Sequence, residues 1–556
     1  MSKYIFVTGG VVSGLGKGIT AASIGLILKS SGLSVDAVKF DPYLNVDPGT
    51  MSPYEHGEVY VLKDGSETDL DLGHYERFLN VNLTGISSVT AGKIYTHILD
   101  REREGQFLGK NVQLIPHVTN YIKECFARDS SCDVRIIEIG GSTGDFEGEV
   151  FLESFRQFRR ENKGQVLHVH LGYVPFLKCS GEYKSKPLQT SIRELLKSGL
   201  QPDIVVARYS IENGIDLDQS ILDKIALFSN LGNENVIALP DLENIYKVPL
   251  YLLSNSNIQN SLQTYLKTEL QPVLPDFFKK IQNPLKFKVK IGIVAKYNKL
   301  LDSYLSIIEA LKIAGVELNS EVEIIVLDAE ALEKKDPEVW DNLKNVQGII
   351  VPGGFGNRGM EGKILAAQYA RENQIPYLGI CLGLQMAIVE FARNICGVPA
   401  YSSEMFSSRD EMLNKEIVID LMPDQLNIYK KGGTMRLGDY DCWIEPDTLA
   451  SRLFTDWGST TQDHKIKITE RHRHRLEVQS KYISTFEEKG MVISGKHWYL
   501  DKNQDQKFLV ELVELEKTVH PYFISTQSHP EFLGRPNKPH PLFKGLLEAA
   551  LSGFSQ

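Results

Sequence analysis

The sequence predicts an α/β protein of two domains, each built on a mostly parallel β-sheet. Its 556 residues exceed what one hydrophobic core usually organises. Short β-branched runs alternate with longer helical patterns in both halves, which is typical of parallel sheets covered by helices on both faces. A proline-containing stretch separates the two sets of runs. We therefore expect a first domain over 1–268, a linker over 269–288 and a second domain over 289–556.

The expected strands are short apolar runs without regular polar alternation, as in sheets buried on both sides. They lie at 4–8, 35–40, 134–139, 166–171, 203–208, 289–295, 322–328, 347–354 and 376–381. The stretch 268–288 between the two sets carries three prolines, which restrict both their own backbone and that of the preceding residue. This composition favours a linker, and a surface loop within one larger domain is the alternative.

Composition excludes several classes of function. The formal charge of −10, from 61 basic and 71 acidic residues, gives no general reason to bind nucleic acid or an anionic membrane. The six cysteines form no CxxC pair, which argues against a zinc ribbon or a disulfide framework. No apolar run reaches the roughly 18 residues that a spanning helix needs. We expect a cytoplasmic protein without a redox cofactor.

A glycine-rich turn follows the first expected strand. The stretch YIFVTGGVVSGLGKGI leads through glycines to Lys17, and a helix is expected to open at Ile19. Backbone N–H groups of such a turn bind phosphate, and the lysine adds a positive charge. The spacing departs from a standard P-loop, because five residues separate Gly10 from Gly16 and Gly18 stands where Ser or Thr would bind magnesium. A purely structural turn is the alternative.

Two carboxylates are candidates for the missing magnesium ligand. Asp71 lies in ETDLDLGHYERF, and Glu138 ends an apolar strand at the sheet edge where open α/β sheets bind ligands. A charge at the end of a buried strand needs a partner, so a structural ion pair is the alternative for Glu138. Lys184 and Lys186, beside a proline, form a third basic feature, which by itself is also typical of a solvated loop.

A single cysteine in the second half has the setting of a nucleophile. Cys381 lies between Gly379 and Gly383, where a strand gives way to a helix-like segment. This is the geometry of the GxSxG nucleophile elbow with sulfur in place of oxygen. The N-terminus of a helix also favours a thiolate over a thiol. An ordinary buried core cysteine is the alternative.

The other parts of an acyl-transfer site follow in the sequence. The glycine-rich loop 349–359 would supply an oxyanion hole from the backbone near Gly354, together with the N–H of Leu382. His529 and Glu531 stand two positions apart in FISTQSHPEF, so in extended chain they point to the same side. We expect the carboxylate to orient the imidazole and the imidazole to act as the base.

These motifs resemble known families. The second half resembles the class I glutamine amidotransferases in GICLGLQ, PGGFG and HPE. The first half resembles the synthetase domain of the CTP synthase family in VTGGVVSGLGKGI, KFDPYLNVDPGTMSPYEHGEV, DLDLGHYERF, EIGGSTGD and KSKPLQ. The resemblance covers nearly the whole chain and implies a dethiobiotin-synthetase-like, P-loop-like first domain and a class I amidotransferase second domain.

The resemblance also implies an activity and its partners. Members of this family are C–N ligases that convert UTP, ATP and glutamine into CTP, ADP, phosphate and glutamate. ATP phosphorylates the uracil O4, ammonia displaces the phosphate, and a tunnel carries the ammonia so that water does not protonate it. The implied cofactor is Mg²⁺. GTP as an allosteric activator, CTP as a feedback inhibitor and a homotetramer are further implied.

Site residues carry over position by position from the resemblance. The implied catalytic residues are Cys381, His529 and Glu531. ATP is implied at Gly14, Leu15, Gly16, Lys17, Gly18, Ile19, Lys39, Asp71, Pro240, Asp241 and Leu242, and magnesium at Asp71 and Glu138. UTP or CTP is implied at Ser13, Asp145, Phe146, Glu147, Lys184, Ser185, Lys186, Pro187, Leu188, Gln189 and Lys224. Glutamine is implied at Gly354, Leu382, Gly383, Leu384, Gln385, Glu404 and Arg475.

Two positions depart from the family pattern. Leu188 stands where a hydroxyl side chain is more common. An apolar leucine cannot make the polar contact to the nucleotide that the hydroxyl implies. Pro240 stands where a lysine near the adenine is common.

Two other functions are alternatives to the CTP-forming reaction. One is an ATP-dependent amidotransferase of another acceptor, such as the cobyric acid type, and the other is a nucleotide-sensing or filament-forming scaffold without catalysis.

Overall fold

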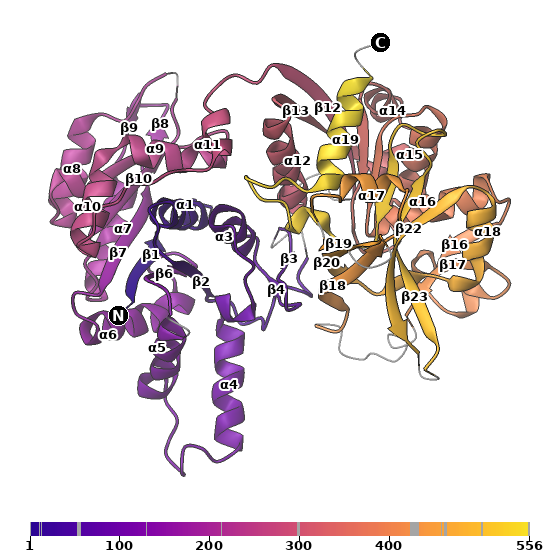
Figure 1. Ribbon diagram of the computed structural model, residues 1–556. Helices are drawn as coiled ribbons and strands as arrows, with labels where there is room; N and C mark the ends of the chain where they lie inside the picture. The colour runs from indigo at the N-terminus through magenta and orange to yellow at the C-terminus, as the bar shows by residue number, and fades with distance from the viewer. Residues whose placement is uncertain are drawn as a thin grey trace. The chain divides into compact units, whose positions relative to one another are not determined.

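The structure is a computed structural model, and it divides the chain into two compact units (Figure 1). Unit 1 contains residues 1–48 and 68–282, and unit 2 contains residues 49–67 and 283–556. The description covers residues 2–10, 12, 14–52, 57–128, 131–212, 214–296, 301–422, 433–457, 459–460, 464–501 and 504–553. Each unit is an α/β structure, so the predicted fold class is confirmed.

Unit 1 is built on a seven-stranded sheet in which every adjacent pair is parallel. The strand order is β11-β10-β7-β1-β6-β2-β5. The strands are β1 (Lys3–Gly9), β2 (Val35–Asp41), β5 (Ser88–Thr90), β6 (Val134–Ile139), β7 (Val166–Tyr173), β10 (Ile204–Tyr209) and β11 (Val236–Pro240). A separate hairpin joins β8 (Phe176–Leu177) and β9 (Glu182–Tyr183).

Helices cover the unit 1 sheet and bury its apolar side chains. They are α1 (Lys17–Ser30), α3 (Asp71–Leu79), α4 (Ala91–Arg103), α5 (Thr119–Ala127), α6 (Glu149–Glu161), α7 (Lys186–Lys197), α8 (Gln219–Ser229), α9 (Val248–Ser254), α10 (Ser256–Leu266) and α11 (Asp276–Lys280). Helix α1 packs against α3 and α9, and α5 packs against α6. Phe6 of β1 stacks on Phe155 of α6 with ring centroids 3.9 Å apart, which anchors that helix to the centre of the sheet.

Unit 2 is built on a ten-stranded sheet that is parallel in one half and antiparallel in the other. The order is β13-β12-β14-β15-β24-β23-β22-β18-β20-β19, and the parallel pairing ends at β24. The strands are β12 (Phe287–Ala295), β13 (Ser320–Asp328), β14 (Gly348–Val351), β15 (Tyr377–Ile380), β18 (Arg436–Ile444), β19 (Ser459–Thr460), β20 (Ile466–His474), β22 (Met491–Leu500), β23 (Gln506–Leu515) and β24 (Phe523–Thr526). A smaller sheet contains β16 (Ala400–Ser402), β17 (Glu416–Leu421) and β21 (Leu476–Val478).

Two hydrophobic clusters lie in unit 2 between its sheet and its helices. One contains the buried side chains of α15 and α16, and the other contains those of α12 and α19. The helices are α12 (Leu305–Glu317), α13 (Ala329–Glu333), α14 (Pro337–Lys344), α15 (Met360–Glu372), α16 (Leu382–Asn394), α17 (Leu449–Leu453), α18 (Ile483–Glu488) and α19 (Pro541–Ser552). In the described part of the chain, no helix has the length and apolar character required to cross a bilayer.

A segment from the first half of the sequence, residues 49–67, packs as part of unit 2. It carries the short strand β3 (Tyr60–Val61), which is followed by β4 (Glu67–Thr68). The hydroxyl of Tyr60 donates to the carbonyl of Phe532 at 2.8 Å, and Arg473 donates to the Glu67 carboxylate at 2.8 Å. The predicted division at 268 placed this segment with the first domain. Its packing depends on contacts far apart in the sequence, which no local pattern reveals.

Candidate active sites

The glycine-rich turn in unit 1 joins β1 to α1. Gly14 and Gly16 have φ values of 75° and 80°, a left-handed conformation that glycine adopts without a Cβ clash. Gly16 is the N-cap of α1, so Lys17, Gly18 and Ile19 form its first turn, whose N–H groups have no partner within the helix. The buried Leu15 lies between the two glycines. The turn therefore has the geometry of an anion-binding helix N-terminus.

Gly18 is required because the Asp71 carboxylate occupies the space beside it. A Cβ placed on Gly18 would lie 2.1 Å from Oδ1 of Asp71. Asp71 opens helix α3, which packs against α1. A carboxylate from α3 thus fills the position where a standard P-loop has a serine or threonine hydroxyl. This contact accounts for the departure from the P-loop pattern.

Charged groups cluster beside this turn. The ammonium of Lys39 pairs with Asp69 at 2.9 Å and with Asp71. Although burial lowers the pKa of Lys39, the carboxylates around it raise that pKa well above its usual value. Burial lowers the pKa of Lys17, and Glu138 opposes that change. Burial, and after it the Asp71 charge, raises the pKa of Glu138 to about 7.

The donors in this cluster fit a magnesium ion bound together with a phosphate. Asp71 and Glu138 offer the hard oxygen ligands that magnesium prefers. One oxygen of Asp41, Oδ2, is also buried there and has no hydrogen-bond partner among the described residues. Among the described residues, no group of three or more His, Cys, Asp or Glu side chains could by itself hold a metal. A bound ion would therefore take its remaining ligands from water and phosphate.

The residues implied for UTP and CTP lie in several parts of unit 1. Helix α7 begins at Lys186, with Ser185 as its N-cap and Pro187 in its first turn. The amide of Gln189 donates to Ser185 Oγ at 2.9 Å, and Lys184 pairs with Glu182. The remaining implied residues are Asp145, Phe146 and Glu147 around a short 3-10 turn, and Lys224 on α8; Ser13 lies outside the described residues.

Leu188 is a core residue. Its side chain is fully buried, and a Cβ placed on Gly172 of β7 would lie 2.0 Å from its Cδ1. The leucine side chain is therefore directed into the hydrophobic core between α7 and β7. Leu188 therefore contributes to the packing of α7 on the sheet.

An arginine that the sequence analysis did not single out links two of the implied ATP elements. Arg208 is the next-to-last residue of β10, and its guanidinium pairs with Asp241 at 2.6 Å and donates to the Pro240 carbonyl at 3.0 Å. A Cβ placed on Gly16 would lie 3.8 Å from the same guanidinium. Leu242, the third implied residue of this ATP element, follows Asp241 in the sequence. The signal was present, because Arg208, like Glu138, is a charge at the carboxyl end of a buried strand.

Cys381 occupies a strained turn between β15 and α16. It is the N-cap of α16 with φ 53° and ψ −103°, and only 7% of the residue is exposed. A Cβ on Gly383 would lie 1.9 Å from the Val351 carbonyl, and a Cβ on Gly379 would lie 2.8 Å from the Gly383 backbone. Both glycines are thus required for the close approach of the backbones, as a nucleophile elbow demands.

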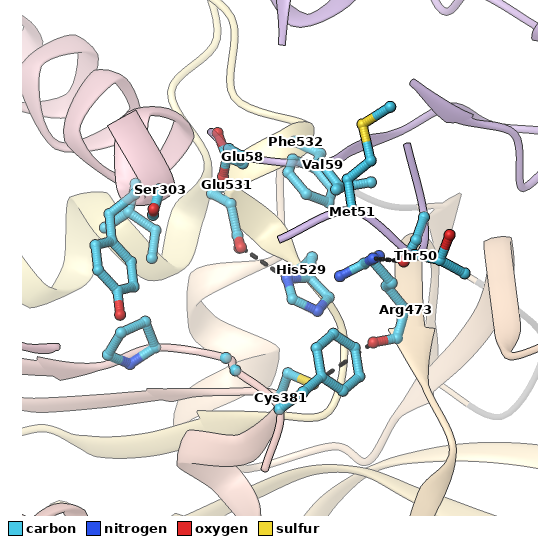
Figure 2. Close-up of a pocket in the computed structure, with 17 residues that line it drawn as sticks. Thr50, Met51, Glu58, Val59, Ser303, Cys381, Arg473, His529, Glu531 and Phe532 are labelled. Carbon is cyan, nitrogen blue, oxygen red and sulfur yellow. Dashed lines mark hydrogen bonds and ion pairs between the residues drawn. The ribbon is translucent and has the colours of Figure 1, made fainter. Parts of the chain in front are cut away.

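His529 and Glu531 lie beside this cysteine (Figure 2). Nδ1 of His529 and Oε1 of Glu531 are 2.7 Å apart, and the imidazole stacks on Phe532. Nε2 of His529 is buried, has no hydrogen-bond partner among the described residues, and faces Cys381. Burial lowers the pKa of His529, but the charges of Glu531 and Cys381 outweigh burial and raise it to about 10. The three residues form the spatial arrangement of a catalytic triad.

Two cavities meet at Cys381. A cavity of about 450 Å³ is lined by five of the residues implied for glutamine, which are Gly354, Leu382, Gln385, Glu404 and Arg475. The other two, Gly383 and Leu384, are buried within α16. A second cavity of about 310 Å³ is lined by His529 and Glu531 and also by residues 49–51 and 58–59 (Figure 2). The sequence did not predict that residues 49–51 and 58–59 line a cavity beside Cys381.

Comparisons with known proteins found two matching family models and several similar relatives. Residues 3–268 match the family model described as CTP synthase N-terminus, and residues 299–549 match the one described as Glutamine amidotransferase class-I. The chain is 49% identical to the CTP synthase of Carboxydothermus hydrogenoformans over 99% of both chains. It is 46% identical to that of Herpetosiphon aurantiacus over 100% of both chains. A solved structure, the Trypanosoma brucei CTPS glutaminase domain with bound acivicin, is 33% identical and covers 48% of this chain and 94% of its own, with a TM-score of 0.40.

Proposed function

This chain belongs to the CTP synthase family and aminates UTP to CTP with nitrogen from glutamine, and from that premise we propose how its residues divide the work. Unit 2 hydrolyses glutamine, and unit 1 activates and aminates UTP. The observation that supports this division most directly is the arrangement of Cys381, His529 and Glu531 in unit 2. An independent phosphate-binding turn with its charged cluster lies within unit 1.

In the glutaminase step, His529 holds the proton of the Cys381 thiol while Sγ attacks the carboxamide carbon of glutamine. The developing oxyanion accepts hydrogen bonds from backbone N–H groups near Gly354 and Leu382. His529 returns its proton to the leaving nitrogen, so ammonia departs and a thioester remains. Water, deprotonated by His529, then cleaves the thioester to glutamate and restores the thiol. Glu531 keeps the imidazole oriented and stabilises its charge throughout.

The carboxylate and ammonium groups of glutamine fit the larger cavity. Arg475 is positioned to pair with the α-carboxylate, and Glu404 with the α-ammonium. Glu404 also accepts a hydrogen bond from the N–H of Gly356 at 2.6 Å. This contact joins the substrate-binding side chain to the loop that carries the oxyanion donors. Binding of glutamine and alignment of that loop are therefore coupled.

In the synthetase step, the terminal phosphoryl group of ATP passes to O4 of UTP, and ammonia then replaces the phosphate at C4. The turn from Gly14 to Ile19 binds the phosphates, and Lys17 and Lys39 neutralise the charge on the transferring group. Asp71 and Glu138 would hold a magnesium ion, which supplies positive charge to the phosphates. Ammonia must stay neutral to react, which is the physical reason for an enclosed route from one active site to the other.

The finer partners follow from the family and remain proposals. We propose ATP, UTP and glutamine as substrates, GTP as an activator and CTP as a feedback inhibitor. CTP would share the UTP elements and add Asp145, Phe146 and Glu147. The residue at 146 is 83% exposed, so it is accessible to a ligand or to another subunit of the proposed homotetramer. Cytoplasmic localisation is proposed on the same basis, and all six cysteines are free.

Replacing Asp71 with asparagine is expected to raise the magnesium concentration needed for CTP formation by about 10–100-fold, because a charged metal ligand is lost. The measurement is a magnesium titration of CTP formation from UTP, ATP and ammonia. Asp69→Asn is the matched control, because Asp69 pairs with the same Lys39 at 2.9 Å. An equal shift in both variants, or none in Asp71→Asn, would contradict the assignment of Asp71 as a metal ligand.

The overall function is tested by following UTP in the presence of ATP and magnesium. CTP is expected with either glutamine or ammonia, with one ADP and one phosphate released for each CTP. Turnover with a different acceptor, and none with UTP, would favour the cobyric acid type of amidotransferase. Binding of nucleotides without turnover from either nitrogen source would favour a scaffold.

A further inference from the structure

Two buried lysines hold the carbonyl groups of the loop beside Cys381. Lys363 lies on α15 with none of its surface exposed, and its Nζ donates to the Pro352 carbonyl at 2.6 Å and to the Gly353 carbonyl at 3.4 Å. Lys296 follows β12, is 5% exposed, and donates to the Phe355 carbonyl at 3.4 Å and to the Gly356 carbonyl. Together they bind the carbonyls of four residues in the stretch 352–356.

These contacts determine where the N–H groups of the loop point. In a trans peptide the carbonyl and the following N–H lie in one plane and point in opposite directions. Since Lys363 binds the Pro352 and Gly353 carbonyls, the N–H groups of Gly353 and Gly354 point away from that lysine. A Cβ on Gly353 would lie 3.6 Å from Cβ of Cys381 and 3.1 Å from Cε1 of His529. The loop that Lys363 fixes therefore runs directly beside the nucleophile and the base.

A buried lysine in this position is energetically unfavourable as a packing residue. Burial lowers the pKa of Lys363 well below its usual value, and burial also lowers the pKa of Lys296 to about 8. A methionine would fill the same space without a polar group to desolvate. Each ammonium group nevertheless donates hydrogen bonds to carbonyls of one loop. Orientation of that loop is the function that the contacts themselves indicate.

We propose that Lys363 and Lys296 are positioning residues of the oxyanion hole, which hold the loop carbonyls away from Cys381 so that its N–H groups face the reacting carbonyl. The proposal rests on the glutaminase function proposed above. Neither lysine is among the described residues that line the two cavities at Cys381. Lys363 acts on the donors nearest Cys381, and Lys296 acts on the far end of the loop, where the Gly356 N–H binds Glu404.

The decisive comparison separates the oxyanion from the thiol. Glutamate γ-semialdehyde adds to a cysteine thiol and forms a tetrahedral adduct whose oxygen occupies the oxyanion hole, whereas iodoacetamide alkylates the thiol without requiring that hole. In Lys363→Met, glutamine hydrolysis and semialdehyde affinity are expected to fall together by about 100-fold, the effect of losing one oxyanion donor. The alkylation rate of Cys381, the KM for glutamine and CTP formation from ammonia are expected to stay within about 3-fold.

Two further variants guard against a folding defect. Lys296→Met, at the less buried position, is expected to show the same pattern with a smaller loss, and Lys296→Arg, which keeps a donor, is expected to restore part of it. Lys344→Met removes an exposed lysine of the same unit and is the matched control. Unchanged semialdehyde affinity in Lys363→Met, or a parallel loss of alkylation and thermal stability in the lysine variants, would overturn the proposal. Glutamine hydrolysis that survives Cys381→Ala would instead overturn the glutaminase assignment.

Discussion

Cys381→Ala is expected to lower CTP formation from glutamine by about 10⁵–10⁶-fold while CTP formation from ammonia stays within about 3-fold of the wild type. The sulfur is the atom that forms the thioester, and no other cysteine lines either cavity at this site among the described residues. Alanine keeps the Cβ, so the strained backbone at φ 53° is retained. In the proposed mechanism, activation of UTP in unit 1 does not use the thiol.

The measurement follows CTP formation with saturating ATP, UTP and magnesium, first with glutamine and then with ammonia. Cys396→Ala is the control, because Cys396 is a partly buried cysteine of the same unit whose thiol donates to the Thr485 carbonyl at 3.9 Å and lines neither cavity. That variant is expected to keep both activities. If Cys381→Ala lost both activities in parallel, the two active sites could not be separated as proposed.

The parallel strands were predictable because their burial on both faces leaves a simple signal. Each of the nine predicted runs contains a strand of the structure, for example 134–139 as β6 and 289–295 within β12, although only Gly348–Val351 of the run 347–354 is a strand. The antiparallel strands β18 and β20 were not predicted, because they carry many charged residues. Arg436 of β18 is nevertheless buried, since it pairs with Glu511 of β23 at 2.7 Å. The usual inference that charged residues lie at the surface fails where such partners come from distant strands.

The site was predictable where its chemistry is local in the sequence. Cys381 and its flanking glycines lie within five residues, and His529 and Glu531 are two positions apart. The segment 49–67 and Lys363 were not predictable, because their roles depend on tertiary packing. On a helix, a lone lysine usually marks the solvated face, and only the structure shows that Lys363 is directed inward to the loop carbonyls.

Glu531→Gln is expected to lower glutamine hydrolysis by about 10³–10⁴-fold, while CTP formation from ammonia is retained. Glutamine has nearly the same size but carries no charge, so the carboxylate that most strongly raises the pKa of His529 is lost. Burial would then dominate and lower that pKa, and the imidazolium would no longer be stabilised. The amide can also donate to Nδ1, which would place the proton of the imidazole on the wrong nitrogen.

The pH dependence of stability gives a second readout for the same variant. In the folded protein the pKa of His529 is about 10, above the value of about 6.5 for an unperturbed histidine. A raised pKa stabilises the folded state fully below the unfolded pKa, and this contribution is lost as pH rises through the folded pKa. The difference in Tm between the wild type and Glu531→Gln should therefore be largest near pH 6 and shrink towards pH 10.

Glu548→Gln is the control for both readouts, because Glu548 is a more exposed glutamate of the same unit that pairs with Lys544 at 3.8 Å. Its Tm difference from the wild type should be small and should change little over this pH range. A Glu531→Gln variant with normal glutamine hydrolysis would remove Glu531 from the catalytic arrangement. If glutamine hydrolysis fell as expected but the Tm difference did not change with pH, Glu531 would orient His529 without stabilising its charge.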